Sequence, residues 1–173
     1  EPMLEIDFLT ELVAKAKVHG IHTCLDTSGI MFPGFPEDGE ATSDITLEKI
    51  DRLLDVTDLV MLDIKHIRDE DHRKLTGHSN KNILAFARYL DQRKKPVWIR
   101  HVLVPERNDK DEYLHRLADF IHTLNNVERV EVLPYHTLGV FKWEKLGVPY
   151  PLEGIRPPEK ERVENAERIL QAP

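Results

Sequence analysis

The chain has 173 residues, of which 31 are acidic and 24 are lysine or arginine, so its formal net charge is −7. This length suits one domain with one sizeable core. The negative charge argues against nucleic acid or an anionic membrane surface as the main partner. No apolar stretch approaches the roughly 20 residues that cross a bilayer, and the chain does not begin with a secretory leader pattern. We therefore expect a cytoplasmic protein.

The sequence contains one cysteine, Cys24. A single thiol excludes an internal disulfide and any metal or cluster site built from several thiolates of this chain. Cys24 lies in an apolar run with Ile21 and Leu25, so we expect a buried and unreactive thiol.

Helical and extended patterns alternate from the first residues onward. Apolar residues at helical spacing between residues 6 and 16 predict a helix that ends at Gly20. A strand is expected at His22–Thr27. Residues 31–44 are rich in proline, glycine and acids without any period, which predicts a loop.

The same alternation continues through the middle of the chain. Thr46 is a suitable N-cap for a helix that leads into a second strand at Leu59–Lys65. Residues 69–75 have a short helical pattern, and Ser79 can cap a further helix. A third strand follows at Val97–Pro105, after a proline that blocks helix continuation.

The remaining pattern completes about four strand-helix units in one domain over residues 1–173. A helix beginning at Asp109 or Asp111 precedes a fourth strand at Val130–His136. Residues 137–157 are predicted to be irregular, and the last helix is expected to begin at Pro158.

Helices of this length between apolar strands imply parallel neighbours with right-handed crossovers, hence a curved α/β sheet. The sheet is predicted to be doubly wound or part of a TIM-like barrel. Four strands cannot close a barrel, which usually has eight.

Each predicted strand ends in charged or hydrogen-bonding side chains, among them Asp26, Asp63, Lys65, Arg100 and His136. Ligands of parallel α/β folds bind at the carboxyl ends of the strands, so these side chains are candidates for one shared site. Residues two apart on a strand share a face, so Asp63 and Lys65 require either each other or a ligand. Lys65 could alternatively form a Schiff base, as in aldolases.

Other polar residues allow structural interpretations. Asp26 could cap a turn before Gly29, and Arg100 and His101 should point to opposite faces of their strand. His66, His72 and His78 lack metal-ligand spacing and are expected to face solvent.

The acidic run at residues 108–112 lacks the glycine and terminal glutamate of a calcium loop. A helix N-terminus accounts for its acids better.

Five segments together resemble the pyruvate formate-lyase activating enzymes of the radical S-adenosylmethionine (SAM) superfamily. They are GIHTCLDTSG (20–29), VTDLVMLDIK (56–65), WIRHVLVP (98–105), LPYH (133–136) and YPLEGIRPP (150–158). The resemblance covers nearly the whole chain. It implies a segment of a (β/α)6 barrel that binds SAM and a [4Fe-4S] cluster.

In that family, SAM and the cluster together generate a 5′-deoxyadenosyl radical that takes a hydrogen atom from a glycine of the partner lyase. The resemblance implies pyruvate formate-lyase as partner, through its glycine loop, and a flavodoxin-type electron donor. An activating enzyme of another glycyl radical enzyme is the alternative within the family. A non-enzymatic domain that only binds its partner, or is inert, is a further alternative.

Site residues carry over from the family by position. The residues that match its SAM contacts are Asp63, Ile64, Lys65 and His136. The residues that match its monovalent-cation site are Asp26, Thr27, Met61 and Asp63. Arg100 matches an arginine thought to hold the partner's glycine loop.

The family's cluster-binding CxxxCxxC loop has no counterpart in this sequence. Glu1-Pro2 matches the end of the family's Gly-Gly-Glu-Pro motif, so we expect a C-terminal portion that is catalytically incompetent alone. Without a preceding strand, the strand at His22–Thr27 would present an unpaired edge, through which two copies could associate.

Overall fold

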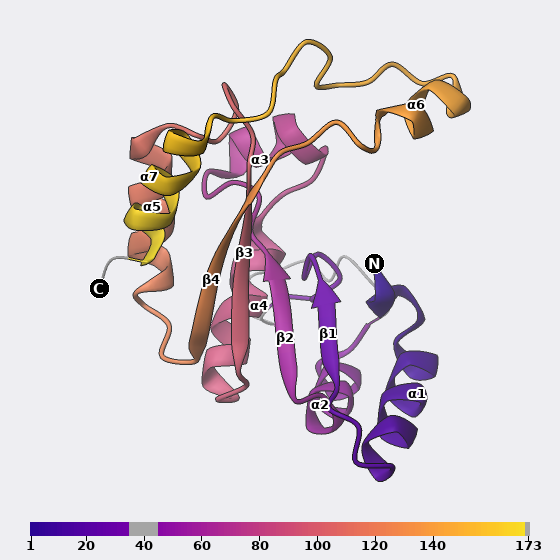
Figure 1. Cartoon of the computed structure of the whole chain (residues 1–173). Helices are drawn as coiled ribbons and strands as arrows, with labels where there is room; N and C mark the ends of the chain where they lie inside the picture. Colours follow the sequence, from indigo (N-terminus) through magenta and orange to yellow (C-terminus); the bar gives the residue numbers. More distant parts are fainter. Residues whose placement is uncertain (35–44, 172–173) are drawn as a thin grey trace.

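The computed structural model describes residues 1–34 and 45–171 and contains a four-stranded parallel sheet (Figure 1). The strands lie in the order β1-β2-β3-β4. Their bounds are Cys24–Thr27 (β1), Leu59–Asp63 (β2), Val97–Leu103 (β3) and Val127–Pro134 (β4). The predicted parallel α/β sheet is confirmed. The predicted loop at residues 31–44 falls mostly outside the described residues.

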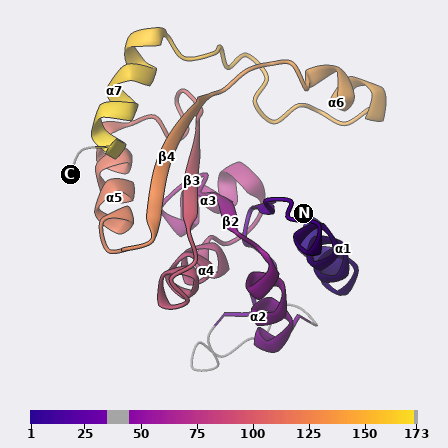
Figure 2. The ribbon, with the colours of Figure 1, turned by 60° about the horizontal axis from the view of Figure 1, so that its bottom comes forward.

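Helices cover one side of this sheet. The main helices are α1 (Ile6–Val18), α2 (Leu47–Val56), α4 (Lys81–Gln92), α5 (Asp111–Ile121) and α7 (Lys160–Gln171). Figure 2 shows them in an arc around the strands, with the opposite side of the sheet left open. The shorter elements are a 3-10 turn at Pro2–Glu5, α3 (Asp69–Thr76) and α6 (Val140–Leu146). One covered and one open face are what a piece of a barrel wall would have.

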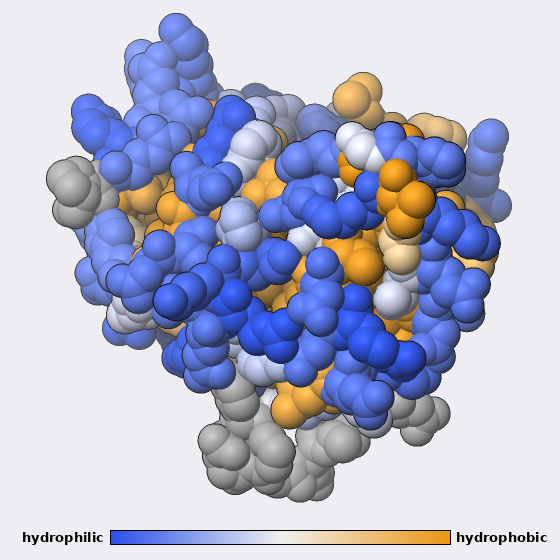
Figure 3. Space-filling model, turned by 90° about the horizontal axis from the view of Figure 1, so that it is seen from below, coloured by the Kyte–Doolittle hydropathy of each residue, from blue (hydrophilic) through white to orange (hydrophobic). Residues whose placement is uncertain are grey.

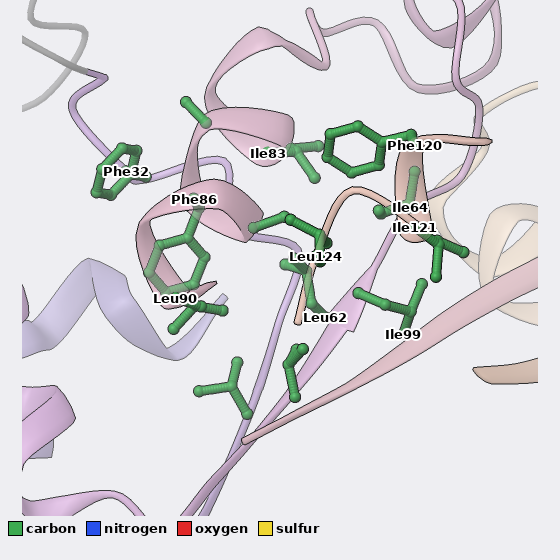
Figure 4. Close-up of a cluster of buried hydrophobic side chains, with 14 of the residues drawn as sticks. Phe32, Leu62, Ile64, Ile83, Phe86, Leu90, Ile99, Phe120, Ile121 and Leu124 are labelled. Atoms are coloured by element: carbon green, nitrogen blue, oxygen red, sulfur yellow. The ribbon is translucent and has the colours of Figure 1, made fainter. Parts of the chain in front are cut away.

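The core lies between the sheet and this arc of helices. Leu62 and Ile64 at the end of β2 and Phe86 and Leu90 of α4 are all fully buried (Figure 4). Phe32 packs against Phe86, with ring centroids 5.3 Å apart. Burying one such side chain contributes about 1.5–3 kcal/mol to folding, so this layer fixes the β2 end on which the candidate site depends.

Helix starts agree closely with the sequence-based expectations. The Thr46 hydroxyl caps α2 by accepting a hydrogen bond from Lys49 N at 3.3 Å. The N-cap position of α4 is Asn80 rather than Ser79, although the Ser79 hydroxyl accepts from Lys81 N at 3.2 Å.

The strand boundaries differ by two or three residues from the predicted ones. β1 begins at Cys24 rather than His22, and β2 ends at Asp63, so that Lys65 follows the strand. β4 begins at Val127 and ends at Pro134, which places His136 beyond it.

The prediction that residues 137–157 are irregular is wrong in part, because α6 lies within them. None of its side chains is buried, and Phe141 and Leu146 are exposed. Seven residues are too few for apolar periodicity to indicate a helix rather than a loop.

β1 is an edge strand among the residues that the structure describes, with β2 as its neighbour. Association of two copies through this edge stays a prediction. Within the described ranges, no helix combines the length and apolar character needed to span a membrane. Seen from the amino ends of the strands, the surface is mostly hydrophilic, with apolar residues showing between polar ones (Figure 3).

Candidate functional site

The open face of the sheet carries the polar residues that the sequence singled out. The parallel register pairs Asp26 with Met61 across β1 and β2, and Asp63 with Arg100 across β2 and β3. Paired residues of neighbouring strands project from the same face of a sheet. Asp26, Met61, Asp63 and Arg100 therefore share the open face near the carboxyl ends of three strands.

One ion-pair network joins Asp26, Asp63, Lys65 and Arg100. The Arg100 guanidinium donates two hydrogen bonds to the Asp26 carboxylate and a third, from Nε at 2.8 Å, to Asp63 Oδ1. Lys65 Nζ donates to the other Asp63 oxygen, Oδ2, at 2.9 Å. The expectation that Asp63 and Lys65 share a face is confirmed, and they contact each other directly.

The network is partly shielded and has equal numbers of positive and negative groups. The side chains of Arg100 and Asp63 are 17% and 19% exposed, whereas that of Asp26 is 54% exposed. Burial disfavours the charged guanidinium, but hydrogen bonds and attraction from Asp26 and Asp63 outweigh it and raise the pKa of Arg100. Lys65 is held by Asp63, which gives no support to a Schiff-base role.

The end of β1 is organised by Thr27 and Glu1 rather than by Asp26. The buried Thr27 hydroxyl donates to Glu1 Oε1 at 2.6 Å and accepts from Gly29 N at 3.0 Å. The Ser28 hydroxyl donates to Glu1 Oε2 at 2.6 Å. The turn-capping interpretation of Asp26 is therefore wrong, since its carboxylate binds Arg100 instead. A cation bound by Asp26 and Asp63 would compete with Arg100 for both carboxylates.

His136 is not drawn into this network. It is exposed and lies two residues beyond the end of β4. Within the described part of the chain, its side chain has no hydrogen-bond or ion-pair partner. The structure thus brings together Asp26, Asp63, Lys65 and Arg100, but leaves His136 apart.

Three expectations about burial are wrong. Cys24 is exposed, because it projects from β1 onto the face that no helix covers. Partial loss of hydration and the nearby Asp26 carboxylate raise the pKa of its thiol, which keeps it protonated. His66 and His72 are 1% and 2% exposed rather than facing solvent, because their ring nitrogens bond local groups, Arg68 N and the His78 carbonyl. His78 is exposed, as expected.

His101 lies on the opposite face from Arg100, as predicted, and is fully buried. Its Nδ1 lies 2.7 Å from the Ile64 carbonyl oxygen, so Nδ1 carries the proton and donates. Burial lowers the pKa of His101 to about 4, because the imidazolium would be dehydrated.

This lowered pKa predicts a loss of stability in mild acid. Below pH 6.5 the unfolded chain takes up a proton at His101 that the folded chain refuses until about pH 4. The free energy of unfolding should therefore fall by about 2 kcal/mol from this group between pH 7 and pH 5. Urea unfolding at both pH values should show a smaller fall for His101→Asn, which keeps a donor. An equal fall in both proteins would contradict the assignment.

Comparisons with known proteins agree with this fold. Residues 1–118 match the family model of the radical SAM superfamily. The chain is 53% identical over 170 residues to the pyruvate formate-lyase-activating enzyme of Streptococcus mutans, covering 98% of this chain and 62% of that protein. It is 50% identical over 171 residues to that of Listeria monocytogenes, covering 99% and 66%. The chain thus spans just under two thirds of the length of these curated relatives.

A solved structure shares the fold. The crystal structure of a domain of pyruvate-formate lyase-activating enzyme from Bacteroides vulgatus superposes with a TM-score of 0.76 at 22% sequence identity, covering 99% of this chain and 88% of that one. The family model itself matches more than half of the 173 residues. The chain belongs to the radical SAM superfamily.

Proposed function

We propose that this chain forms part of the SAM-binding and partner-binding wall of an enzyme that generates a glycyl radical on pyruvate formate-lyase. The observation that carries the proposal is the ion-pair network. Asp63 and Lys65, the two charged SAM-contact candidates, meet Arg100 and Asp26 at the carboxyl ends of β1–β3. The identity of 50–53% to relatives named pyruvate formate-lyase-activating enzymes supports the same function.

The donor set suits SAM, which carries ribose hydroxyls, an amino group and a carboxylate. Asp63 can accept from ribose hydroxyls, Lys65 can donate to a carboxylate or hydroxyl, and the exposed His136 can reach a ribose from the β4 side. Ile64 lies between Asp63 and Lys65. Its N–H donates to the Arg100 oxygen and its carbonyl oxygen lies 2.7 Å from His101 Nδ1, so only the second lone pair of that oxygen would be available to the ligand. Bound SAM and a reduced [4Fe-4S] cluster would supply the radical that takes hydrogen from glycine. The residues of this chain would bind SAM and orient it.

The cluster itself does not fit the residues present. Clusters of this kind are held by several cysteine thiolates, whereas the chain contains only Cys24. The ligands must therefore come from outside these 173 residues, and the chain alone is expected to be catalytically inactive.

The remaining assignments follow from the same proposal. Arg100 would exchange Asp26, the more exposed of its two carboxylates, for the glycine loop of the lyase. A monovalent cation would bind near Asp26, Thr27, Met61 and Asp63. A flavodoxin-type donor would supply the electron in the cytoplasm, and residues 1–173 would act as one domain.

A chimera tests this function. Residues 1–173 would replace the matching segment of the Streptococcus mutans enzyme, to which they are 53% identical. With iron and sulfide, SAM and a reductant under anaerobic conditions, the chimera should produce a glycyl radical signal on pyruvate formate-lyase by electron paramagnetic resonance.

The matched control is the same chimera carrying Asp63→Asn, which should give little signal. A chimera that holds the cluster and cleaves SAM, but leaves the lyase without a radical, would overturn the choice of partner. A signal on a different glycyl radical enzyme would instead support the alternative within the family.

A further inference from the structure

Four consecutive main-chain carbonyls after Asp63 each accept a hydrogen bond from a side chain. The Ile64 oxygen lies 2.7 Å from His101 Nδ1, and the Lys65 oxygen lies 2.8 Å from Asn108 Nδ2. Asn80 Nδ2 bonds the next two carbonyls, that of His66 at 3.0 Å and that of Ile67 at 2.8 Å. The segment 64–67 contains two of the residues proposed to contact SAM.

The three donors come from distant parts of the chain and are deeply buried. His101 lies in β3, Asn80 at the start of α4, and Asn108 in the loop before α5. Their side chains are only 1–2% exposed. We name Asn80, His101 and Asn108, acting on the carbonyls of residues 64–67, the carbonyl clamp.

The carbonyl clamp begins where the pairing of β2 with β3 ends. The last main-chain hydrogen bond between these two segments joins Ile64 N to the Arg100 oxygen at 3.0 Å. Beyond this bond, the Asn108 side chain connects the segment after β2 with the end of β3. Its amide nitrogen, which holds the Lys65 oxygen, also donates to the Val102 oxygen, and its amide oxygen accepts from Val104 N, both at 2.7 Å. The Asn108 side chain therefore acts as an additional rung between β2 and β3 after they diverge.

Divergence of strands at their carboxyl ends opens space for a ligand, but it also leaves main-chain carbonyls without sheet partners. Loops normally satisfy such groups with water and remain mobile. Here, buried side chains take the place of water over a whole segment. An element held this way keeps one geometry before its ligand arrives, which reduces the ordering cost of binding.

We propose that Asn80, His101 and Asn108 are positioning residues. His101 and Asn108 hold Ile64 and Lys65 directly, and Asn80 holds the next two carbonyls, so that the segment keeps the geometry that binds SAM. The SAM part of this inference rests on the proposed function. None of the three side chains needs to touch the ligand, because each acts through the carbonyl that it holds.

The first test measures main-chain order in the free protein by ¹⁵N relaxation. Residues 64–67 should be rigid in the unaltered chain, with order parameters of about 0.85, and should fall toward about 0.6 in Asn108→Ala. Asn126→Ala is the matched control. Asn126 Nδ2 also donates to a main-chain carbonyl, that of Lys95 at 2.7 Å, but at the amino end of the sheet. It should leave the order of residues 64–67 unchanged.

The second test titrates the same proteins with SAM, well below their unfolding temperatures. The dissociation constant should rise at least fivefold for Asn108→Ala and less than twofold for Asn126→Ala, even where both variants lower the unfolding temperature. A merely structural role would move the unfolding temperature but not the dissociation constant.

A pair of variants at His101 decides the question if Asn108→Ala fails to fold. His101→Leu removes the donor to Ile64, and His101→Asn restores an N–H near the position of Nδ1. Weaker SAM binding and lower order in the first, both recovered in the second, are the expected results.

Unchanged order at residues 64–67 in Asn108→Ala, or in His101→Leu if Asn108→Ala does not fold, would overturn the inference. Failure of the unaltered chain to bind SAM would overturn the proposed function instead, and the relaxation data would still decide whether the carbonyl clamp holds the segment.

Discussion

Replacing Gly29 with alanine is expected to lower the free energy of unfolding by about 3 kcal/mol. Gly29 has φ +73°, a left-handed conformation that an L side chain rarely adopts. A Cβ atom there would lie 2.9 Å from Leu62 Cδ1 and 3.0 Å from Phe86 Cδ1. Both neighbours are fully buried in the core under β2, so neither can move away freely.

Gly77→Ala is the matched control for this substitution. Gly77 has a similar φ of +81°, but nothing lies within 4 Å of its added Cβ. Gly77→Ala should therefore lower the free energy of unfolding by only about 1 kcal/mol, the cost of placing an L residue in the left-handed conformation. Urea unfolding of the two variants measures the difference, and equal losses would show that the crowding at Gly29 is absent in solution.

Replacing Asp63 with asparagine is expected to raise the dissociation constant for SAM at least tenfold. Asp63 joins Arg100 and Lys65 through one carboxylate, with contacts of 2.8 and 2.9 Å. Asparagine has nearly the same shape but no charge, so both cations lose their shared partner and the ligand loses an anionic acceptor. Hydrogen bonds to charged groups are worth about 1.5–3 kcal/mol, and 1.4 kcal/mol corresponds to a factor of ten.

Asp58→Asn provides the matched control for Asp63→Asn. Asp58 also pairs with a lysine, Lys17, and accepts from Thr23 N at 2.9 Å, but it lies at the amino end of β2. This control should lower stability without weakening SAM binding. Isothermal titration with SAM would measure the dissociation constants of the unaltered chain and of the two variants, at a temperature where all three are folded. Equal weakening by Asp63→Asn and Asp58→Asn would argue against a specific role of Asp63.

Much of the fold could be predicted because its causes are local. Helical apolar spacing, Thr46 as a cap and the apolar strand runs gave the order of the elements. The alternation of side chains along a strand also predicts Arg100 opposite His101. Asp63 and Lys65 do pair, as expected, but Lys65 lies beyond the end of β2, so strand alternation is not the reason. Within the site, the convergence of Asp26, Asp63, Lys65 and Arg100 follows from the rule that parallel strands align their carboxyl ends.

The errors come from information that a local pattern does not contain. Cys24 has an apolar neighbourhood in sequence, but which sheet face the helices cover is a property of the whole fold. Neither Asn108, 43 residues from Lys65, nor His101, 37 residues from Ile64, could be recognised as a partner of β2. In the sequence each of them is only a single polar residue, in a strand for His101 and in a loop for Asn108, with no spacing that points to a partner.

α6 could not be predicted because it is short. Its seven residues are fewer than the window over which apolar periodicity can be read, and they bury no side chain.

A titration of the ¹⁵N-labelled chain with SAM tests the central claim most directly, because NMR detects even weak binding residue by residue. Binding at the open face predicts concentration-dependent shifts for the amides of Asp63, Ile64 and Lys65, and for Asp26 and His136 across the site. Asn125 and Asn126, at the opposite end of the sheet, should not shift. Shifts absent from residues 63–65 at millimolar SAM, or confined to another surface, would contradict the account.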